Sequence, residues 1–575
     1  MNKDNNAVFH INNILLSAYS EDKDFCSKLS EENDKLKEYV TKELQDEYIL
    51  VKKGTPFTLP EKEAPRKERA VLYVQNNQPA RAFWEFVRLW KKSPKDIGLM
   101  KNIVSSLLVI KAYKAILEYF EKPFLEYMEK DFEVMHLLAA AYFSSQENYD
   151  KALPLYEKLI EKYPKNPQFY YHLAFCYERV YQDKYLDKQV MYARKSEELY
   201  DKNNVLLVFL GKILYRAGEK EECFKCFEKA MANNPSPEDI VAYSRILMME
   251  GDITKGYDLY RCRFDTGIVS YPKLLTPDKR WDGKSDLSDS TVIVHYEQGF
   301  GDSVMFSRYI PEIAKIAKKV IFVVQKNLIP IFKSSGYDRY CEILSHEADV
   351  NPNIKLDNTN RSVMYSGGSG MAKIPHDYHI PLMDTPFLFK ESPDKMAQAS
   401  GYLSANQDKV IEFREKYINK NSKIKVGLSY HGTKDSILTY RDISVKRFLP
   451  LLKMEGVEFY SFQSDEYANE LQELDKTIKI TDLGKVFKDF EDTACAMNCM
   501  DVIISTDNVV MNLAGALGVK TYALFNKYVE SRWYQVDGDD IGWYKSVRPF
   551  HAKTFNDWDN LILDVKSALE KDFNL

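Results

Sequence analysis

The chain has 575 residues and a formal net charge of −5 at pH 7. Its length exceeds what one hydrophobic core supports, and its slight acidity argues against nucleic acid as the main partner. No segment has the length and hydrophobicity of a membrane span and the N-terminal residues lack the apolar core of a signal peptide, so we expect a cytoplasmic protein of several domains with no membrane span.

The N-terminal part reads as helical. Residues 1–66 are dense in charge and end in the proline-containing stretch TPFTLPEKEAPRKE, which predicts a charged helix followed by a linker. Residues 67–132 have a helical apolar pattern, with one face formed by residues between 82 and 90. We interpret this second segment as a set of divergent copies of the repeats that follow it.

Residues 133–270 contain an internal period of about 34 residues, which is typical of tetratricopeptide repeats. Small or aromatic residues recur at the positions where paired helices meet: Ala140, Ala174, Gly211, Tyr156 and Phe227. An insertion near 182–185 displaces the second helix of the second copy. Stacked repeats form an α-solenoid whose curved groove holds extended peptide or another protein, so this half predicts a protein partner.

Cysteine usage indicates neither disulfides nor a metal site. The chain has eight cysteines, and Cys223 and Cys226 form the only CxxC pair. This pair falls in a helical pattern rather than after a strand, so we interpret both as reduced thiols in a core.

The C-terminal half alternates strand-like and helical segments, which predicts parallel sheets with helices on both faces. The expected strands are Thr291–His295, Val320–Val324, Ile424–Tyr430, Val457–Gln463, Ile478–Thr481, Asp501–Ser505 and Thr521–Phe525. We divide the region into two Rossmann-like domains at 280–390 and 421–550, a connector at 391–420 and a C-terminal helix within 551–575. Ligands of such sheets bind beyond the carboxyl ends of the strands, so the site is expected in the cleft between the two domains.

A glycine turn in the first of these domains is the strongest indication of chemistry. The expected strand at 291–295 runs into Glu297, Gly299, Gly301 and Asp302, and a helical pattern follows. The two glycines allow the backbone to approach a ligand closely, and Asp302 lies at a helix start. Glu297 is a candidate for orienting substrate.

A second helix start in the other domain is suited to phosphate. The strand ending at Ser505 leads to Asp507 and Asn508, and a helix with several small residues follows. The free N–H groups at such a helix start, together with the positive end of its dipole, suit a diphosphate. The alternative is that Asp507 is only a helix N-cap.

A polar loop after the first strand of this domain favours the phosphate interpretation. It carries His431, Gly432, Lys434 and Arg441, and a planar guanidinium matches phosphate oxygens well. Gln463 follows the next expected strand and reaches the same edge of the sheet. Three loops are therefore expected to converge there.

Several motifs occur in one order between about residues 240 and 550: GDITKGYDLYRCRF, RWDGK, EQGFGDSVMFSRYIP, DYHIPLMDTP, VGLSYHG, YSFQSDE, DVIISTDN with NLAGALG, and the late SRWYQ and GWY. With these motifs the chain resembles bacterial tetratricopeptide-repeat glycosyltransferases whose GT-B module is similar to the ADP-heptose:lipopolysaccharide heptosyltransferases (glycosyltransferase family 9-like).

The resemblance implies a repeat solenoid followed by a GT-B fold, in which the first Rossmann-like domain faces the acceptor and the second holds a nucleotide-sugar. It implies that Asp302 is the general base and that no metal is required. The implied donor contacts are Lys434, Arg441, Gln463, Asp507, Asn508 and Asn512. Relatives usually carry histidine where this chain has Asn512, and the terminal helix of GT-B folds commonly returns to brace the first domain.

Our hypothesis is therefore a hexosyl- or heptosyltransferase-like enzyme that uses a nucleotide-sugar as co-substrate and has no other cofactor. It would modify a hydroxyl of a protein recruited by the repeats, such as a bacterial surface or flagellar protein. The alternative is a non-catalytic repeat scaffold with a degenerate nucleotide-binding module, which the replacement at Asn512 favours. A metal-dependent alternative rests on the Asp-x-Asp spacing of DGDD at 537–540, which we interpret as an acidic surface turn.

Overall fold

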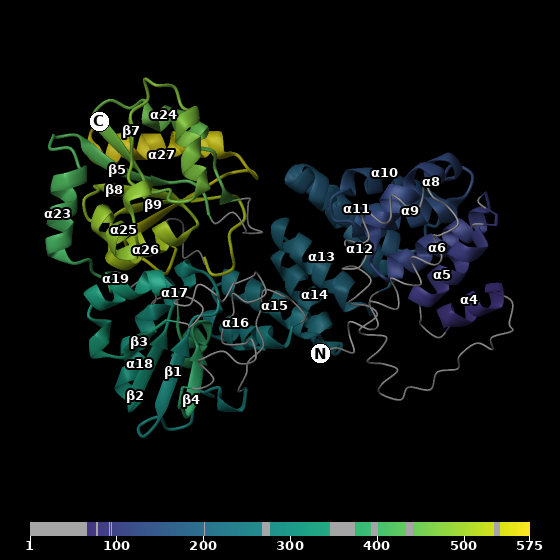
Figure 1. Ribbon diagram of the computed structural model, residues 1–575, viewed down its shortest axis with the longest axis horizontal. Coiled ribbons are helices and arrows are strands. Elements are labelled where there is room, and N and C mark those ends of the chain that lie inside the picture. The colour runs from purple at the N-terminus through teal and green to yellow at the C-terminus, as the bar shows by residue number, and fades with distance from the viewer. Residues whose placement is uncertain are drawn as a thin grey trace. The chain divides into compact units, whose positions relative to one another are not determined.

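A computed structural model describes residues 66–75, 79–90, 92–93, 95–200, 202–266, 277–345, 374–392, 401–432, 441–533 and 541–575. Its contacts divide the chain into two compact units, Met1–Phe224 and Lys225–Leu575 (Figure 1). The predicted charged helix and linker at 1–66 lie outside the described residues, apart from Arg66 at the start of the first described helix.

The described part of the first unit is helical. Its helices are α4 (Arg66–Gln75), α5 (Pro79–Trp90), α6 (Ile97–Val109), α7 (Tyr113–Tyr119), α8 (Glu121–Tyr127), α9 (Phe132–Ser144), α10 (Tyr149–Lys162), α11 (Pro167–Tyr181), α12 (Leu186–Leu199) and α13 (Asn204–Arg216). Consecutive helices from α9 to α13 pack against one another, as a solenoid requires.

The repeat period is visible in the helix starts. Side-chain oxygens of Asp131, Asn166 and Asn203 accept hydrogen bonds from the first turns of α9, α11 and α13, which are the leading helices of successive repeats. A 3₁₀ turn, η1 (Gln182–Tyr185), precedes α12 and accounts for the predicted insertion. Tetratricopeptide repeats followed by an α/β region are thus present, as the sequence pattern predicts.

The second unit begins within α14 (Lys220–Ala232) and includes α15 (Pro237–Met249) and α16 (Ile253–Tyr260). Val241 of α15 and Tyr257 of α16 belong to the same buried hydrophobic cluster as residues of the first Rossmann-like domain. The last repeat helices are therefore part of the core of the α/β unit.

Two all-parallel sheets form the α/β region, and each defines one lobe. The first lobe has β1 (Thr291–His295), β2 (Lys319–Val323), β3 (Glu342–Leu344) and β4 (Tyr378–Pro381) in the order β3-β2-β1-β4. The second lobe has β5 (Ile424–Ser429), β6 (Val457–Ser461), β7 (Ile480–Asp482), β8 (Val502–Thr506), β9 (Thr521–Phe525) and β10 (Val547–His551) in the order β10-β9-β8-β5-β6-β7. When its strands are numbered from β5 and read from the β7 edge, the second sheet has the order 3-2-1-4-5-6 of a dinucleotide-binding Rossmann fold.

Helices between the strands complete the two Rossmann-like lobes of a GT-B fold. In the first lobe they are α17 (Phe300–Phe306), α18 (Ile310–Ile316), α19 (Ile329–Ser334) and α21 (Thr385–Leu388). In the second they are α24 (Leu449–Leu452), α25 (Phe490–Met497), α26 (Val509–Leu517) and α27 (Trp558–Phe573). Part of the predicted connector forms α23 (Gln407–Tyr417), which packs against α25.

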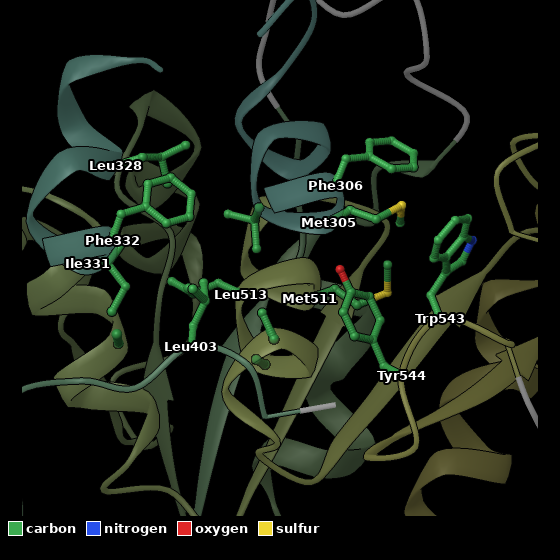
Figure 2. Packing of buried hydrophobic residues seen from close by; sticks show 14 of the residues in the cluster. Met305, Phe306, Leu328, Ile331, Phe332, Leu403, Met511, Leu513, Trp543 and Tyr544 are labelled. Carbon is green, nitrogen blue, oxygen red and sulfur yellow. The ribbon is translucent and has the colours of Figure 1, made fainter. Parts of the chain in front are cut away.

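The two lobes meet where α17 packs on α26. Figure 2 shows Met305 of α17 facing Met511 of α26, with Phe306 on the side of Trp543 and with Tyr544 beside Met511. All of these side chains are buried in one cluster, so the lobes share a hydrophobic core at this contact.

An arginine reinforces the lobe contact. Arg308, just after α17, donates to the backbone oxygen of Trp543 at 3.0 Å. Its guanidinium carbon lies 4.8–5.1 Å from the ring centroids of Tyr402, Trp543 and Tyr544. These rings belong to the connector and the second lobe, and a cation held among aromatic faces is stabilised by their electron density.

A buried ionic network joins the end of the repeats to the first lobe. Arg263 follows α16 and donates to both carboxylate oxygens of Glu297, at 2.6 and 2.7 Å. It also lies 3.0 Å from Asp384, which accepts two further hydrogen bonds from Arg280. The Arg263 side chain is fully buried. Neighbouring carboxylates outweigh the cost of burial and hold the pKa of Arg263 above its ordinary value.

The resemblance implied that the C-terminal helix braces the first domain, but the helix packs on the second domain instead. Trp558, Leu561 and Ile562 of α27 pack with Val426 and Leu428 of the second sheet. The helix therefore covers one face of the second lobe, because its apolar stripe matches the buried strands β5 and β8 there.

None of the described helices is both long enough and apolar enough to cross a membrane.

The network predicts a large stability loss on breaking its centre. Arg263→Met should lower the free energy of unfolding by about 3–5 kcal/mol, because Glu297 and Asp384 would stay buried without their partner. Arg447→Met is the control, since Arg447 pairs with Asp559 at an exposed position and should cost at most about 1 kcal/mol. Urea unfolding monitored by fluorescence measures both. Equal losses of unfolding free energy in Arg263→Met and Arg447→Met would show that the network adds no stability.

Candidate functional site

The turn after β1 places Asp302 at the lobe contact. Gly299 is the N-cap of α17, and its N–H donates to Oδ2 of Asp302 at 3.1 Å. Asp302 is 6% exposed. A Cβ on Gly301 would lie 2.9 Å from Nδ2 of Asn512, so a side chain there would displace the Asn512 amide where α17 approaches α26. The close approach at Gly301 is thus to the opposite lobe.

Glu297 is bonded within the protein, and its role in orienting substrate stays a prediction. Both carboxylate oxygens accept from Arg263, and Oε1 also accepts from the backbone N–H of Met383 at 3.1 Å. The side chain is buried within the ionic network. Glu297 therefore fixes the start of the glycine turn, because the turn cannot move without breaking a buried ion pair.

The site of the second lobe lies at the carboxyl ends of β5 and β8, neighbouring strands where the strand order reverses. Ligands of open α/β sheets bind at this type of position. Asn508, rather than Asp507, is the N-cap of α26 and accepts from the N–H of Val510 at 2.8 Å. Its Nδ2 donates to Ser429 and to the backbone oxygen of His431. Asn508 thus ties the two strand ends together, and its contact to the donor stays a prediction.

Gln463 also supports the site from within. Its Oε1 accepts from the backbone N–H groups of Tyr430 and His431, at 3.3 and 3.1 Å, and its Nε2 donates to Asp465 at 2.8 Å. These bonds hold the first residues of the loop that follows β5. Gln463 therefore positions this loop, and its contact to the donor stays a prediction.

His431 and Gly432 form the base of the same loop. The N–H of Gly432 donates to Asp442 at 2.8 Å. The His431 ring stacks on Tyr467, with centroids 4.0 Å apart, and its Nε2 lies 2.8 Å from a carboxylate oxygen of Glu470. Burial alone would lower the pKa of His431, but Asp442 and Glu470 outweigh it and raise the pKa. Lys434 lies outside the described residues.

Asn512 lies within the lobe contact. Its Nδ2 donates to the backbone oxygen of Asn508 at 3.0 Å, and its Oδ1 accepts from the hydroxyl of Tyr544 at 3.1 Å. The side chain is 2% exposed. These bonds explain how an asparagine is accommodated beside Gly301, and its contact to the donor stays a prediction.

Two arginines form ion pairs with the carboxylates of the site. Arg441 lies 3.2 Å from Asp507 at the second strand-end edge. Arg532, in the segment after β9, forms an ion pair with Asp302 of the first lobe. The carboxylates of Asp302 and Asp507 are both close enough to Arg532 to raise its pKa, against the opposing effect of burial. Arg532 thus pairs with Asp302, and both Asp302 and Asp507 favour its charged form.

Sequence reasoning did not assign a role to Arg532. The residue is part of the SRWYQ motif, but a single arginine in a loop has no spacing that indicates its partner. The DGDD turn at 537–540 lies outside the described residues. Among the residues that the structure describes, no group of three or more histidine, cysteine or acidic side chains is arranged to hold a metal ion. The described cysteines, including Cys223 and Cys226 of α14, are reduced.

Comparison with known proteins identifies the repeats directly. Residues 133–166 and 155–195 match two models of the tetratricopeptide repeat. The chain is 26% identical to Protein FlbA of Caulobacter vibrioides over 375 residues, which is 62% of this chain and 59% of that protein. The chain thus spans less than two thirds of the relative's length.

Two solved structures are similar to parts of the chain. The glycosyl transferase family 9 structure from Veillonella parvula covers 50% of this chain and 99% of its own, at 12% identity and a TM-score of 0.35. MamA from Desulfovibrio magneticus RS-1 covers 31% of this chain and 97% of its own, at 18% identity and a TM-score of 0.27. At scores this low neither likeness carries an argument about function.

The environment of His431 predicts a pH-dependent stability. Because its pKa is raised in the folded state, protonated His431 stabilises the fold fully below its unfolded pKa of about 6.5, and this contribution is lost as the pH rises through the higher folded pKa. The stability difference between wild type and His431→Gln should therefore be larger at about pH 5.5 than at about pH 9.

Urea unfolding at the two pH values measures this difference, with His551→Gln as the matched control. Burial lowers the pKa of His551, so its contribution should be lost toward low pH, the opposite direction. A stability difference for His431→Gln that does not change with pH would contradict the assigned ionic contacts.

Proposed function

We propose that the protein is a cytoplasmic GT-B glycosyltransferase that moves a sugar from a nucleotide-sugar to a hydroxyl of a protein acceptor. The observation that carries the proposal is the placement of Asp302 at the lobe contact, joined through Arg532 to the strand-end site of the second lobe. The ion pair joins a carboxylate of the first lobe to an arginine of the second, and the proposed transfer needs groups of both lobes to meet in this way.

In the proposed reaction the acceptor oxygen attacks the anomeric carbon while the bond from that carbon to the phosphate oxygen breaks. The hydroxyl proton passes to Asp302, and the nucleoside diphosphate leaves with the electron pair. An unperturbed carboxylate is a weak base toward an alcohol, so proton transfer accompanies departure of the leaving group. The hexosyl- or heptosyltransferase-like character rests on the sequence resemblance.

The donor site is proposed at the carboxyl ends of β5 and β8. Arg441 supplies a guanidinium there, and the N-terminus of α26 supplies the positive end of a helix dipole. Lys434 joins them in the proposal on the strength of the sequence motif. Asp507 holds Arg441 in place through its ion pair. These cationic groups would stabilise the leaving diphosphate without requiring a metal.

The protein acceptor is proposed from the attached repeats. Tetratricopeptide repeats bind extended peptides or other proteins along their groove, and the matched repeat models support this role here. A bacterial surface or flagellar protein is the proposed kind of acceptor.

A second candidate is a non-catalytic scaffold that binds a nucleotide. Asn512 favours it, because relatives usually carry histidine there and its polar atoms bond within the protein. The two candidates differ in one measurable respect, since only the enzyme consumes the donor.

The test is donor turnover by Asp302→Asn. The purified full chain is incubated with a panel of nucleotide-sugars and candidate acceptor proteins, and nucleoside diphosphate release and intact acceptor mass are measured. Loss of the base should reduce turnover about a hundredfold or more. Asp286→Asn is the control, because Asp286 only caps an exposed turn of the same lobe. Activity of Asp302→Asn close to wild type would contradict the assigned base, and wild-type binding without turnover would favour the scaffold.

A further inference from the structure

We propose that Arg532 belongs to the donor site and pairs with Asp302 only until a nucleoside diphosphate binds, so that the donor itself frees Asp302 to act as base. This inference rests on the proposed function and adds an order of events to it. It assigns Arg532, and the ion pair it makes across the lobes, a role in turnover.

Both carboxylate oxygens of Asp302 already have hydrogen-bond partners within the protein. Its Oδ1 is paired with Nη1 of Arg532, and its Oδ2 accepts from the N–H of Gly299. A general base must have an oxygen within hydrogen-bond reach of the proton it takes. An acceptor hydroxyl would therefore compete with a guanidinium for Asp302, and removal of Arg532 from the carboxylate opens the oxygen nearest the second lobe.

Arg532 follows a strand whose carboxyl end lies beside the proposed diphosphate site. It follows β9, which lies next to β8 in the sheet, so its segment leaves the same carboxyl edge as the segment carrying Asp507. The backbone oxygen of Arg532 accepts from the indole N–H of the buried Trp543, and the adjoining Trp533 is 2% exposed. The backbone is thus anchored, while the guanidinium carries the contact between the lobes.

Each of the two arginines is paired with one carboxylate. Arg441 is paired with Asp507, and Arg532 is paired with Asp302. The negative charges of Asp507 and Glu530 also help to raise the pKa of Arg532. In each of these two pairs a guanidinium and a carboxylate neutralise one another. A diphosphate brings several oxygen acceptors and more than one negative charge, and it can engage a guanidinium through two nitrogens. It is therefore a stronger partner for Arg532 than the single oxygen of Asp302.

Substitutions of Arg532 and of Asp302 should change the affinity for a nucleoside diphosphate in opposite directions. Arg532→Gln removes a phosphate contact and should weaken binding about tenfold or more. Asp302→Asn removes the carboxylate that competes for Arg532 and should strengthen binding several-fold. The gain from Asp302→Asn should be absent in the double variant, because it acts through Arg532. A purely structural ion pair would give weaker binding for both single variants.

The experiment is calorimetric titration of ADP, UDP and GDP into the full chain, with thermal melting of each variant as a check of folding. Arg447→Gln is the matched control, since it removes an exposed guanidinium of the same lobe that pairs with Asp559. Arg532→Lys keeps the charge but not the bidentate geometry, and intermediate affinity is expected. It replaces Arg532→Gln as the deciding variant if that protein does not fold.

The inference is overturned if Arg532→Gln and Arg532→Lys bind as tightly as wild type, if Asp302→Asn binds no more tightly, or if its gain persists in the double variant. In those cases donor turnover that depends on Asp302 would leave the glycosyltransferase assignment standing. Wild type that binds none of the three diphosphates and consumes no nucleotide-sugar would overturn both.

Discussion

The ion pair between Asp302 and Arg532 is the interaction on which the proposed chemistry depends, because it links a carboxylate of one lobe to the strand-end edge of the other. It forms where α17 packs on α26, and the missing side chain of Gly301 permits that approach. Polar and apolar contacts serve one geometry here. The hydrophobic cluster fixes the distance between the lobes, and at that distance Asp302 and Arg532 can pair.

The glycine turn is held from behind by a second set of charges. Glu297 is fixed by Arg263, which comes from the segment after the last repeat helix, and Asp384 completes the network from the end of β4. Burying several charges is costly unless each is paired, so the network tolerates little displacement. The end of the repeats and the turn that carries Asp302 are consequently positioned together, and α15 and α16 are part of the same core as the first lobe.

Most of the fold follows from periodicity in the sequence. Long apolar strands and a repeat of helix pairs are strong signals, whereas β3 is only three residues long and β4 and β10 contain Pro381 and Pro549, which weaken a strand pattern. The site was less predictable, because its key contacts join distant residues. Motif position selected Asp302 and Arg441, but only the folded chain shows that Asn508 and Gln463 bond within the protein and that Arg532 reaches the opposite lobe.

The most direct measurement is a crystal structure of the full chain grown with whichever nucleoside diphosphate binds it. The diphosphate should lie beyond the carboxyl ends of β5 and β8, in contact with the guanidinium groups of Arg441 and Arg532. The carboxylate of Asp302 should have left Arg532 and should face the same crevice. A diphosphate bound on another surface, or one bound beside β8 with the ion pair of Asp302 intact, would contradict the proposed site and its activation.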